Sequence, residues 1–139
     1  MRYCHQSPHA RIKNLLAEYA RQDFLPQRPL LDASQALMRR IHAEFTYDPH
    51  ATSIGTPVLE LLRRRRGVCQ DYAHFMISCL RSLGLAARYV SGYLRTHPGN
   101  GTPALVGADA SHAWVAVHCP RQGWVDLDPT NDVLADLDH

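Results

Sequence analysis

Apolar residues recur at helical spacing in the first half of this chain and at alternating spacing in the second half. Apolar side chains at positions 12, 15, 16 and 19 predict a helix over residues 11–22. Residues 23–31 contain two prolines and indicate a linker. The same period predicts a second helix over roughly residues 33–45, with Asp32 as its N-cap.

Two further helices are expected before the pattern changes. A Thr-Pro pair introduces a short helix over residues 57–65, which we expect to stop at Gly67 because glycine tolerates the left-handed cap conformation. A longer helix is predicted over roughly residues 69–83, and Gly84 terminates it.

The later part of the chain favours strands. Residues 87–94 are β-prone, and residues 96–110 form a loop that is rich in Gly and Pro near its start. Residues 112–118 and 124–128 alternate and are joined by a turn at Pro120, which predicts a hairpin.

Helices that precede strands indicate an α+β domain, with N-terminal helices packed on a small antiparallel sheet. A chain of 139 residues with 45% hydrophobic content suits one domain. Within it, residues 1–31 supply the N-terminal helix and linker, and residues 32–139 supply the core. Three strands are few for four helices, so we expect a truncated core whose further C-terminal strands are missing.

Composition excludes several kinds of partner. The net charge of +2 is too small to favour nucleic acid, and the run of arginines at 63–66 is typical of a solvated helix end. No segment approaches the length of a membrane span and the N-terminus lacks a signal-like apolar stretch, so we expect a cytoplasmic protein without membrane contact. The histidines and the four cysteines show no metal-ligand or disulfide spacing, so neither a metal nor another cofactor is expected.

Cys69 is the first candidate for chemistry. Its predicted place in the first helical turn favours an anion, because unpaired backbone N–H groups and the helix dipole point there. A thiol in that setting is shifted toward the nucleophilic thiolate. The alternative is a buried structural cysteine, which is how we interpret Cys79 in the interior of the same helix.

The predicted hairpin supplies a base and a carboxylate. If its strands pair symmetrically about Pro120, His112 lies opposite Asp128, and Trp114 shares their face. The other face is then uniformly apolar, and a slip of one residue would destroy it, which supports this register. A carboxylate beside an imidazole fixes its tautomer, as in hydrolytic triads. A surface ion pair on an amphipathic hairpin is the alternative, and spacing alone favours neither.

Four segments together resemble the transglutaminase-like superfamily, and most closely its bacterial and archaeal cysteine protease group. They are residues 67–74, 86–93, 111–115 and 123–131, in the order and with the spacing typical of the family. The resemblance implies a papain-like α+β fold in which Cys69 is the nucleophile, His112 the base and acid, and Asp128 the residue that orients His112.

Together these features predict acyl transfer or hydrolysis at an amide carbonyl of a peptide or protein substrate, through a thioester. The second oxyanion donor is left open between three candidates: Gln70, Tyr47 and Trp114. Two tyrosines, Tyr89 and Tyr93, either line the cleft or pack in the core. The alternative function is a catalytically silent peptide-binding module on the same fold. A zinc site at Cys69 and His112 would need further ligands that the spacing does not offer.

Overall fold

The computed structural model describes residues 8–50, 56–93 and 111–135. It contains four helices in these ranges: α1 (Pro8–Arg21), α2 (Leu30–Glu44), α3 (Val58–Arg64) and α4 (Cys69–Ser82). The six strands there are β1 (Thr46–Tyr47), β2 (Arg66–Gly67), β3 (Ala87–Tyr93), β4 (Ser111–Cys119), β5 (Gly123–Asp128) and β6 (Val133–Leu134). Helices precede a small antiparallel sheet, as the sequence pattern predicts, and the α+β class is confirmed.

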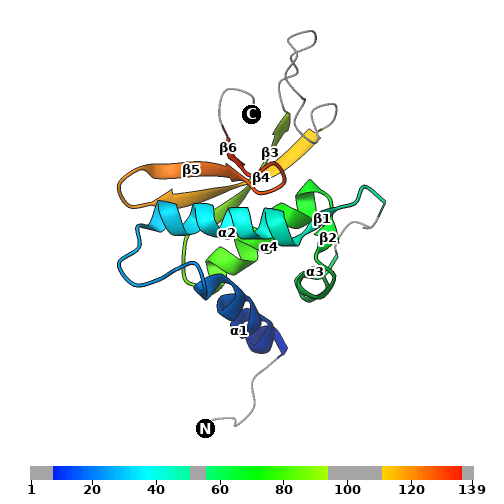
Figure 1. Cartoon of the computed structure of the whole chain (residues 1–139), viewed down its shortest axis with the longest axis horizontal. Helices are drawn as coiled ribbons and strands as arrows, with labels where there is room; N and C mark the ends of the chain where they lie inside the picture. Colours follow the sequence, from blue (N-terminus) through cyan, green and yellow to red (C-terminus); the bar gives the residue numbers. More distant parts are fainter. Residues whose placement is uncertain (1–7, 51–55, 94–110, 136–139) are drawn as a thin grey trace.

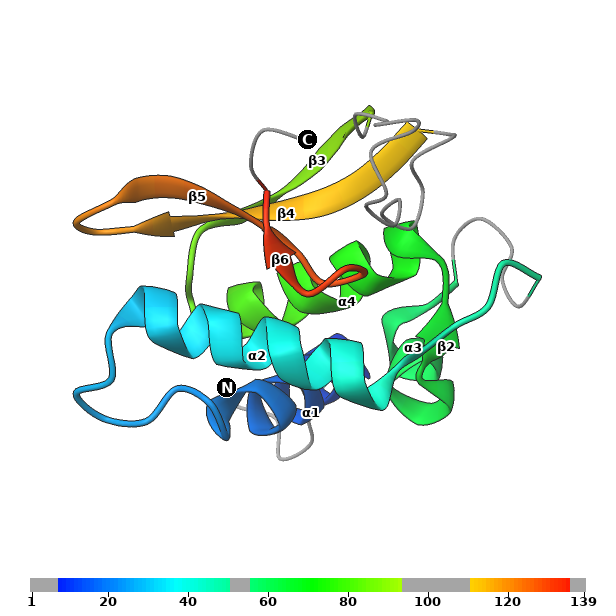
Figure 2. The same ribbon diagram turned by 45° about the horizontal axis from the view of Figure 1, so that its top comes forward.

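Helix α4 lies at the centre of the molecule. In Figures 1 and 2 the sheet lies on one side of α4 and α1 lies on the other side. Helix α4 is apolar around most of its circumference, and Tyr72, Phe75, Met76 and Leu80 are each at most 2% exposed. A helix buried in this way is held by packing rather than by its own propensity. The position of its first residue, Cys69, is therefore set by the core.

The ends of α4 follow the prediction. Helix α4 begins at Cys69, and Gly84 follows it with a left-handed φ of 83°. The amide of Gly84 donates to the Arg81 carbonyl at 2.9 Å, and the amide of Leu85 donates to the Leu80 carbonyl at 3.1 Å. These two bonds form a Schellman motif, which satisfies carbonyls at the helix end.

Two other helix ends differ from the prediction. Asp32 is not the N-cap of α2; Pro29 is, in an extended conformation, and Asp32 lies in the first turn, where its charge complements the dipole. Helix α3 ends at Arg64, and its left-handed C-cap is Arg65, with φ of 54°, rather than Gly67. Gly67 instead belongs to β2, where it pairs in parallel with Tyr47.

The main sheet has the strand order β3-β4-β5-β6, with antiparallel pairs throughout. The predicted symmetry of the β4–β5 hairpin about Pro120 is wrong by two residues, since Cys119 pairs with Gly123 and Ala116 with Asp126. The cause is a three-residue turn closed by Gly123, whose φ is 79°. A shift of two residues keeps every side chain on its predicted face. Strand β6 adds a fourth strand that the sequence pattern does not indicate.

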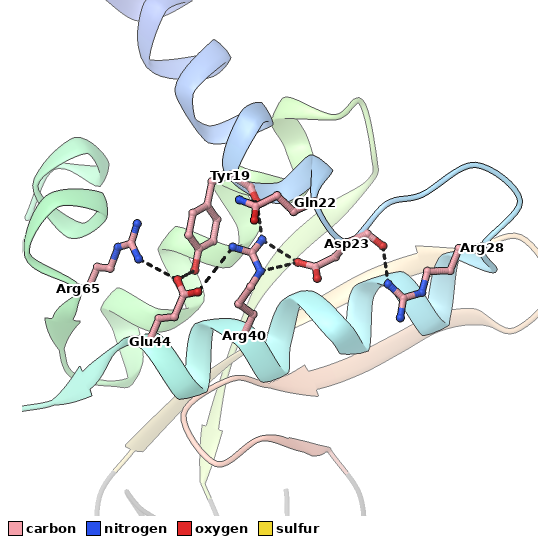
Figure 3. Close-up of polar contacts among 7 residues, drawn as sticks. All are labelled: Tyr19, Gln22, Asp23, Arg28, Arg40, Glu44 and Arg65. Carbon is pink, nitrogen blue, oxygen red and sulfur yellow. Dashed lines mark hydrogen bonds and ion pairs between the residues drawn. The ribbon is translucent and has the colours of Figure 1, made fainter.

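A polar cluster fastens α1 to α2 (Figure 3). Arg40 of α2 donates to the Asp23 carboxylate at 2.9 and 2.7 Å and also to the Tyr19 carbonyl. The Tyr19 hydroxyl donates to Glu44 at 2.7 Å, and Arg65 reaches the same carboxylate oxygen at 2.9 Å. Because Arg65 immediately precedes β2, this cluster also fixes the segment that leads to Cys69.

Candidate active site

The backbone before Cys69 is held in place by Asp71. The Asp71 carboxylate accepts a hydrogen bond from the Val68 amide at 2.9 Å, which is the reach-back half of a capping box. A Cβ atom at Gly67 would lie 2.4 Å from Asp71 Oδ2, so the close approach requires glycine. Through these contacts, Asp71 supports the local fold before Cys69.

His112 and Asp128 form a buried hydrogen-bonded pair. The His112 Nε2 group donates to Asp128 Oδ2 at 2.9 Å, and both side chains are 0% exposed. The alternative of a surface ion pair is therefore wrong. The two residues are diagonal neighbours rather than directly opposite, because Val115 pairs with Leu127 in the observed register.

Asp128 is fixed by several donors besides His112. Its Oδ1 atom accepts hydrogen bonds from the backbone amides of Thr130 at 3.1 Å and Asn131 at 3.3 Å. Its Oδ2 atom accepts a third bond from the Asn131 side-chain amide at 2.8 Å. Each of the partners named here is an N–H donor, and such donors stabilise an ionised carboxylate.

Two residues that hold Asp128 and the loop after it were not predicted from the sequence. Asn131 contacts Asp128 directly, and its place in the Asp-Pro-Thr-Asn segment is the sequence signal that could have identified it. His42 of α2 lies with Nδ1 3.1 Å from the Thr130 carbonyl oxygen and thus holds the loop after Asp128. No local pattern could have identified His42, because this contact joins two distant parts of the chain.

The pKa of His112 is raised to about 9. Burial alone would lower it, but hydrogen bonds from the ring to Asp128 and to Cys69, together with the charges of these two groups, outweigh burial. Cys69 at the start of α4 is thus one of the groups near His112 of β4 that raise its pKa. The structure joins His112 and Asp128 by a direct hydrogen bond.

The three candidates for a second oxyanion donor differ in their surroundings. The Trp114 indole donates its N–H to Asp126 Oδ2 at 3.0 Å, which engages its one donor, and we drop it as a candidate. The ring of Trp114 instead flanks the His112 ring, with centroids 6.0 Å apart. Gln70 is exposed at the second position of α4, and Tyr47 is 37% exposed in β1.

Neither Tyr89 nor Tyr93 packs in the core, since they are 38% and 75% exposed. Tyr89 contacts His74 of α4, with ring centroids 5.2 Å apart. Burial, and then the nearby charges of Cys69 and Asp71, raise the pKa of Tyr89. Tyr89 therefore lies on the wall of the site, and its hydroxyl stays protonated at neutral pH.

Within residues 8–50, 56–93 and 111–135, no three His, Cys, Asp or Glu side chains are placed to share a metal ion. None of the helices in those ranges is long and apolar enough to cross a membrane. The three cysteines that the structure describes are free thiols; they are Cys69, Cys79 and Cys119.

Comparison with known proteins places this geometry in context. An α+β domain with a cysteine at a helix N-terminus, beside a sheet that bears a His–Asp pair, defines the class of papain-like folds. The sequence-family model that describes the transglutaminase-like superfamily matches residues 17–129 of this chain. The chain belongs to this superfamily, as its sequence motifs indicate.

Individual relatives give the same result. An uncharacterized protein of Mycobacterium tuberculosis is 50% identical over 129 residues, which are 90% of this chain and 41% of that protein. The protein-glutamine gamma-glutamyltransferase of Pseudomonas aeruginosa is 36% identical over 135 residues, or 93% of this chain and 19% of that protein. The periplasmic domain of TgpA from the same species has a TM-score of 0.62 at 34% identity, covering 96% of this chain and 47% of that domain. The chain thus spans less than half the length of each of these relatives.

Proposed function

We propose that this domain catalyses acyl transfer or hydrolysis at a carboxamide or peptide carbonyl through a thioester on Cys69. The observation that carries the proposal is the buried His112–Asp128 hydrogen bond of 2.9 Å, with Cys69 at the N-terminus of α4 among the groups that raise the pKa of His112. A thiol, an imidazole and an orienting carboxylate form the triad of many acyl-transfer enzymes.

The proposed reaction has two steps. In the first, the Cys69 thiolate attacks the carbonyl carbon and forms a carbon–sulfur bond, and the carbonyl π electrons move to oxygen. Collapse of this intermediate breaks the C–N bond, and His112 gives its proton to the departing amine. In the second step, His112 takes a proton from water or an incoming amine, which attacks the thioester and releases the Cys69 thiolate.

The oxyanion of the intermediate requires hydrogen-bond donors. The backbone amide of Cys69 is one proposed donor, because amides in the first turn of a helix have no acceptor within the helix. Gln70 and Tyr47 remain candidates for the second donor, since each is exposed near the start of α4.

The Pseudomonas relative suggests the kind of acyl donor. Its name describes transfer of a γ-glutamyl group from protein-bound glutamine. A glutamine carboxamide on a peptide or protein is accordingly the acyl donor that we propose for this chain. An amine that reaches the thioester would give a crosslink, and water would give glutamate.

The proposal is tested by trapping the acyl-enzyme. Acid quench of the protein with glutamine-containing peptides, followed by mass spectrometry, is expected to find the acyl group on Cys69. Replacement of Asp128 by Asn is expected to slow acylation by about 10³- to 10⁴-fold without unfolding the protein, because the imidazole loses its orienting carboxylate. Unchanged acylation in Asp128→Asn would remove Asp128 from the mechanism, and no adduct at all would favour the silent binding module.

Alkylation gives an independent measure of the thiol. Iodoacetamide is expected to label Cys69 faster than Cys79 or Cys119 near neutral pH. Burial raises the pKa of Cys79 to about 12 and also raises that of Cys119, so both remain unreactive thiols. Equal labelling of the three cysteines would contradict an activated Cys69.

A further inference from the structure

We propose that the outer edge of β3 binds an extended segment of the polypeptide substrate as an added strand that runs beside Cys69. This inference rests on the proposed acyl-transfer function and specifies its substrate: an unfolded segment or an extended loop, rather than a small amide. Main-chain hydrogen bonds to a sheet edge are a recurrent way to bind peptides without strict sequence selection.

Strand β3 lies at the edge of the main sheet. It pairs with β4, and in the part of the chain that the structure describes no strand pairs with its other side (Figure 2). Its seven residues contain neither proline nor lysine, two residue types that commonly protect sheet edges from pairing. Such an edge offers a row of backbone donors and acceptors to another extended chain.

The register shows which backbone groups face outward. The His118 amide donates to the Ala86 carbonyl at 3.0 Å, so residues with even numbers in β3 exchange hydrogen bonds with β4. Residues with odd numbers then direct N–H and C=O away from β4. The Arg81 side chain agrees with this assignment, because its Nε donates to the outward carbonyl of Ala87 at 3.0 Å. Beyond this contact, Tyr89 and Ser91 each present an outward N–H and C=O.

This edge runs along α4 toward the nucleophile. Tyr89 is level with His74 of α4, and Gly92 pairs directly with His112, whose pKa is raised by Asp128 and Cys69. Strand β3 is therefore antiparallel to α4, and its outer edge approaches the reacting thiol at the level of Ser91 and Gly92. A strand added to this edge would carry its own peptide groups past Cys69.

The side chains beside the edge suit an extended peptide. Tyr89, Ser91 and Tyr93 share the face of β3 that is turned toward α4, and all three are exposed. Alternate side chains of an added strand would lie against them, while backbone groups supply most of the binding. A small amide has no backbone with which to pair, and a compact folded domain cannot extend along the edge.

A proline at position 91 tests the edge directly. Ser91→Pro removes one outward N–H and adds bulk there, whereas the ladder to β4 uses the backbone groups of Val90 and Gly92. Ser91→Ala is the matched control, since it retains the N–H. Both are made with Cys69→Ala, so that binding is measured without turnover, and the probe is a degenerate library of ten-residue peptides passed over the immobilised protein.

We expect Ser91→Ala to retain peptides like its parent and Ser91→Pro to retain them about tenfold less. Equal retention by Ser91→Pro, with an unchanged melting temperature, would overturn the edge as the binding site. Absence of peptide retention by all three proteins would overturn the substrate assignment. Acyl trapping on Cys69 is a separate measurement, so failure of this inference is distinguishable from failure of the proposed function.

Methylated peptides provide a test that needs no variant of the protein. In an added strand, alternate amides of the peptide face β3 and the others face away. Retained peptides are N-methylated at every second residue, either at odd or at even positions. One of these two patterns is expected to abolish binding and the other to preserve it. Equal effects of the two patterns would contradict strand addition, even if Ser91→Pro fails to fold.

Discussion

At the scale of single residues, the position of Cys69, the proposed nucleophile, depends on a contact between Gly67 and Asp71. Gly67 and Asp71 approach so closely that a Cβ on the glycine would lie 2.4 Å from the carboxylate oxygen. That carboxylate also holds the Val68 amide, one residue before Cys69. The position of Cys69 therefore depends on glycine at position 67, where a side chain would clash with Asp71.

Gly67→Ala is expected to reduce the free energy of unfolding by about 1–3 kcal/mol, because the added methyl displaces Asp71. Urea unfolding measures the loss. In a double-mutant cycle, Asp71→Ser should relieve part of it, since the shorter side chain leaves space for the methyl. Gly84→Ala is the control for additivity: its Cβ would meet nothing within 4 Å, so the cost of its left-handed φ of 83° is independent of Asp71. The effect of Gly84→Ala should add to that of Asp71→Ser. If the effects of Gly67→Ala and Asp71→Ser on the free energy of unfolding also added, the steric explanation would be contradicted.

The chemistry-bearing residues were predictable at this scale and their supports were not. Cys69 at a helix start, and His112 and Asp128 on one face of a hairpin, follow from short-range patterns in the sequence. The contact between His42 and the Thr130 carbonyl depends on how α2 packs against the loop after β5. The contact between the Trp114 indole and Asp126 differs, because strand alternation does place these two residues on one face of the hairpin.

At the scale of secondary-structure elements, α1 and α2 are joined by charges rather than by apolar contacts alone. Arg40 and Asp23 have side chains only 18% and 13% exposed, so their ion pair is largely shielded from water. The Arg40 guanidinium also lies 4.0 Å from the centroid of the Tyr19 ring. Loss of Arg40 would leave Asp23 poorly solvated and without this partner.

Arg40→Ala is expected to lower the free energy of unfolding by about 2–3 kcal/mol, because a shielded carboxylate loses a charged donor. Arg64→Ala is the matched control, since Arg64 is 71% exposed where it pairs with Glu60. Its effect should stay below about 1 kcal/mol. Chemical denaturation of both variants measures the difference, and similar losses would show that the shielding of Arg40 contributes nothing.

The elements themselves were largely predictable, and their exact pairing was not. Periodicity identifies all four helices and the three longer strands, because each buries one face or one stripe of apolar side chains. The register of the β4–β5 hairpin was missed by two residues, since a shift of two preserves the pattern of buried and polar positions. Strand β6 has only two residues and carries too short a pattern to be recognised.

At the scale of the whole molecule, the buried His112–Asp128 pair links protonation to global stability. The pKa of His112 rises from the ordinary 6.5 to about 9 on folding. A raised pKa means that the folded protein holds this proton more tightly than the unfolded chain does. The resulting stabilisation is fully present below about pH 6.5 and is lost as the pH rises through about 9.

Between these two pH values the free energy of unfolding is expected to fall by up to about 3 kcal/mol. Urea unfolding at a series of pH values measures the slope. His112→Gln should remove this decline, because glutamine does not titrate. A decline of equal size in His112→Gln would assign the pH dependence to other groups.

The candidate active site is divided between a helix that comes early in the chain and a hairpin that comes late. Cys69 leaves the ribosome well before His112 and Asp128, and the nascent chain therefore carries a thiol with neither base nor carboxylate. On the proposed mechanism, the reactivity of Cys69 arises only when the sheet packs against α4. Synthesis and quality control would then encounter a cysteine without its proposed base, and completion of the fold would supply it.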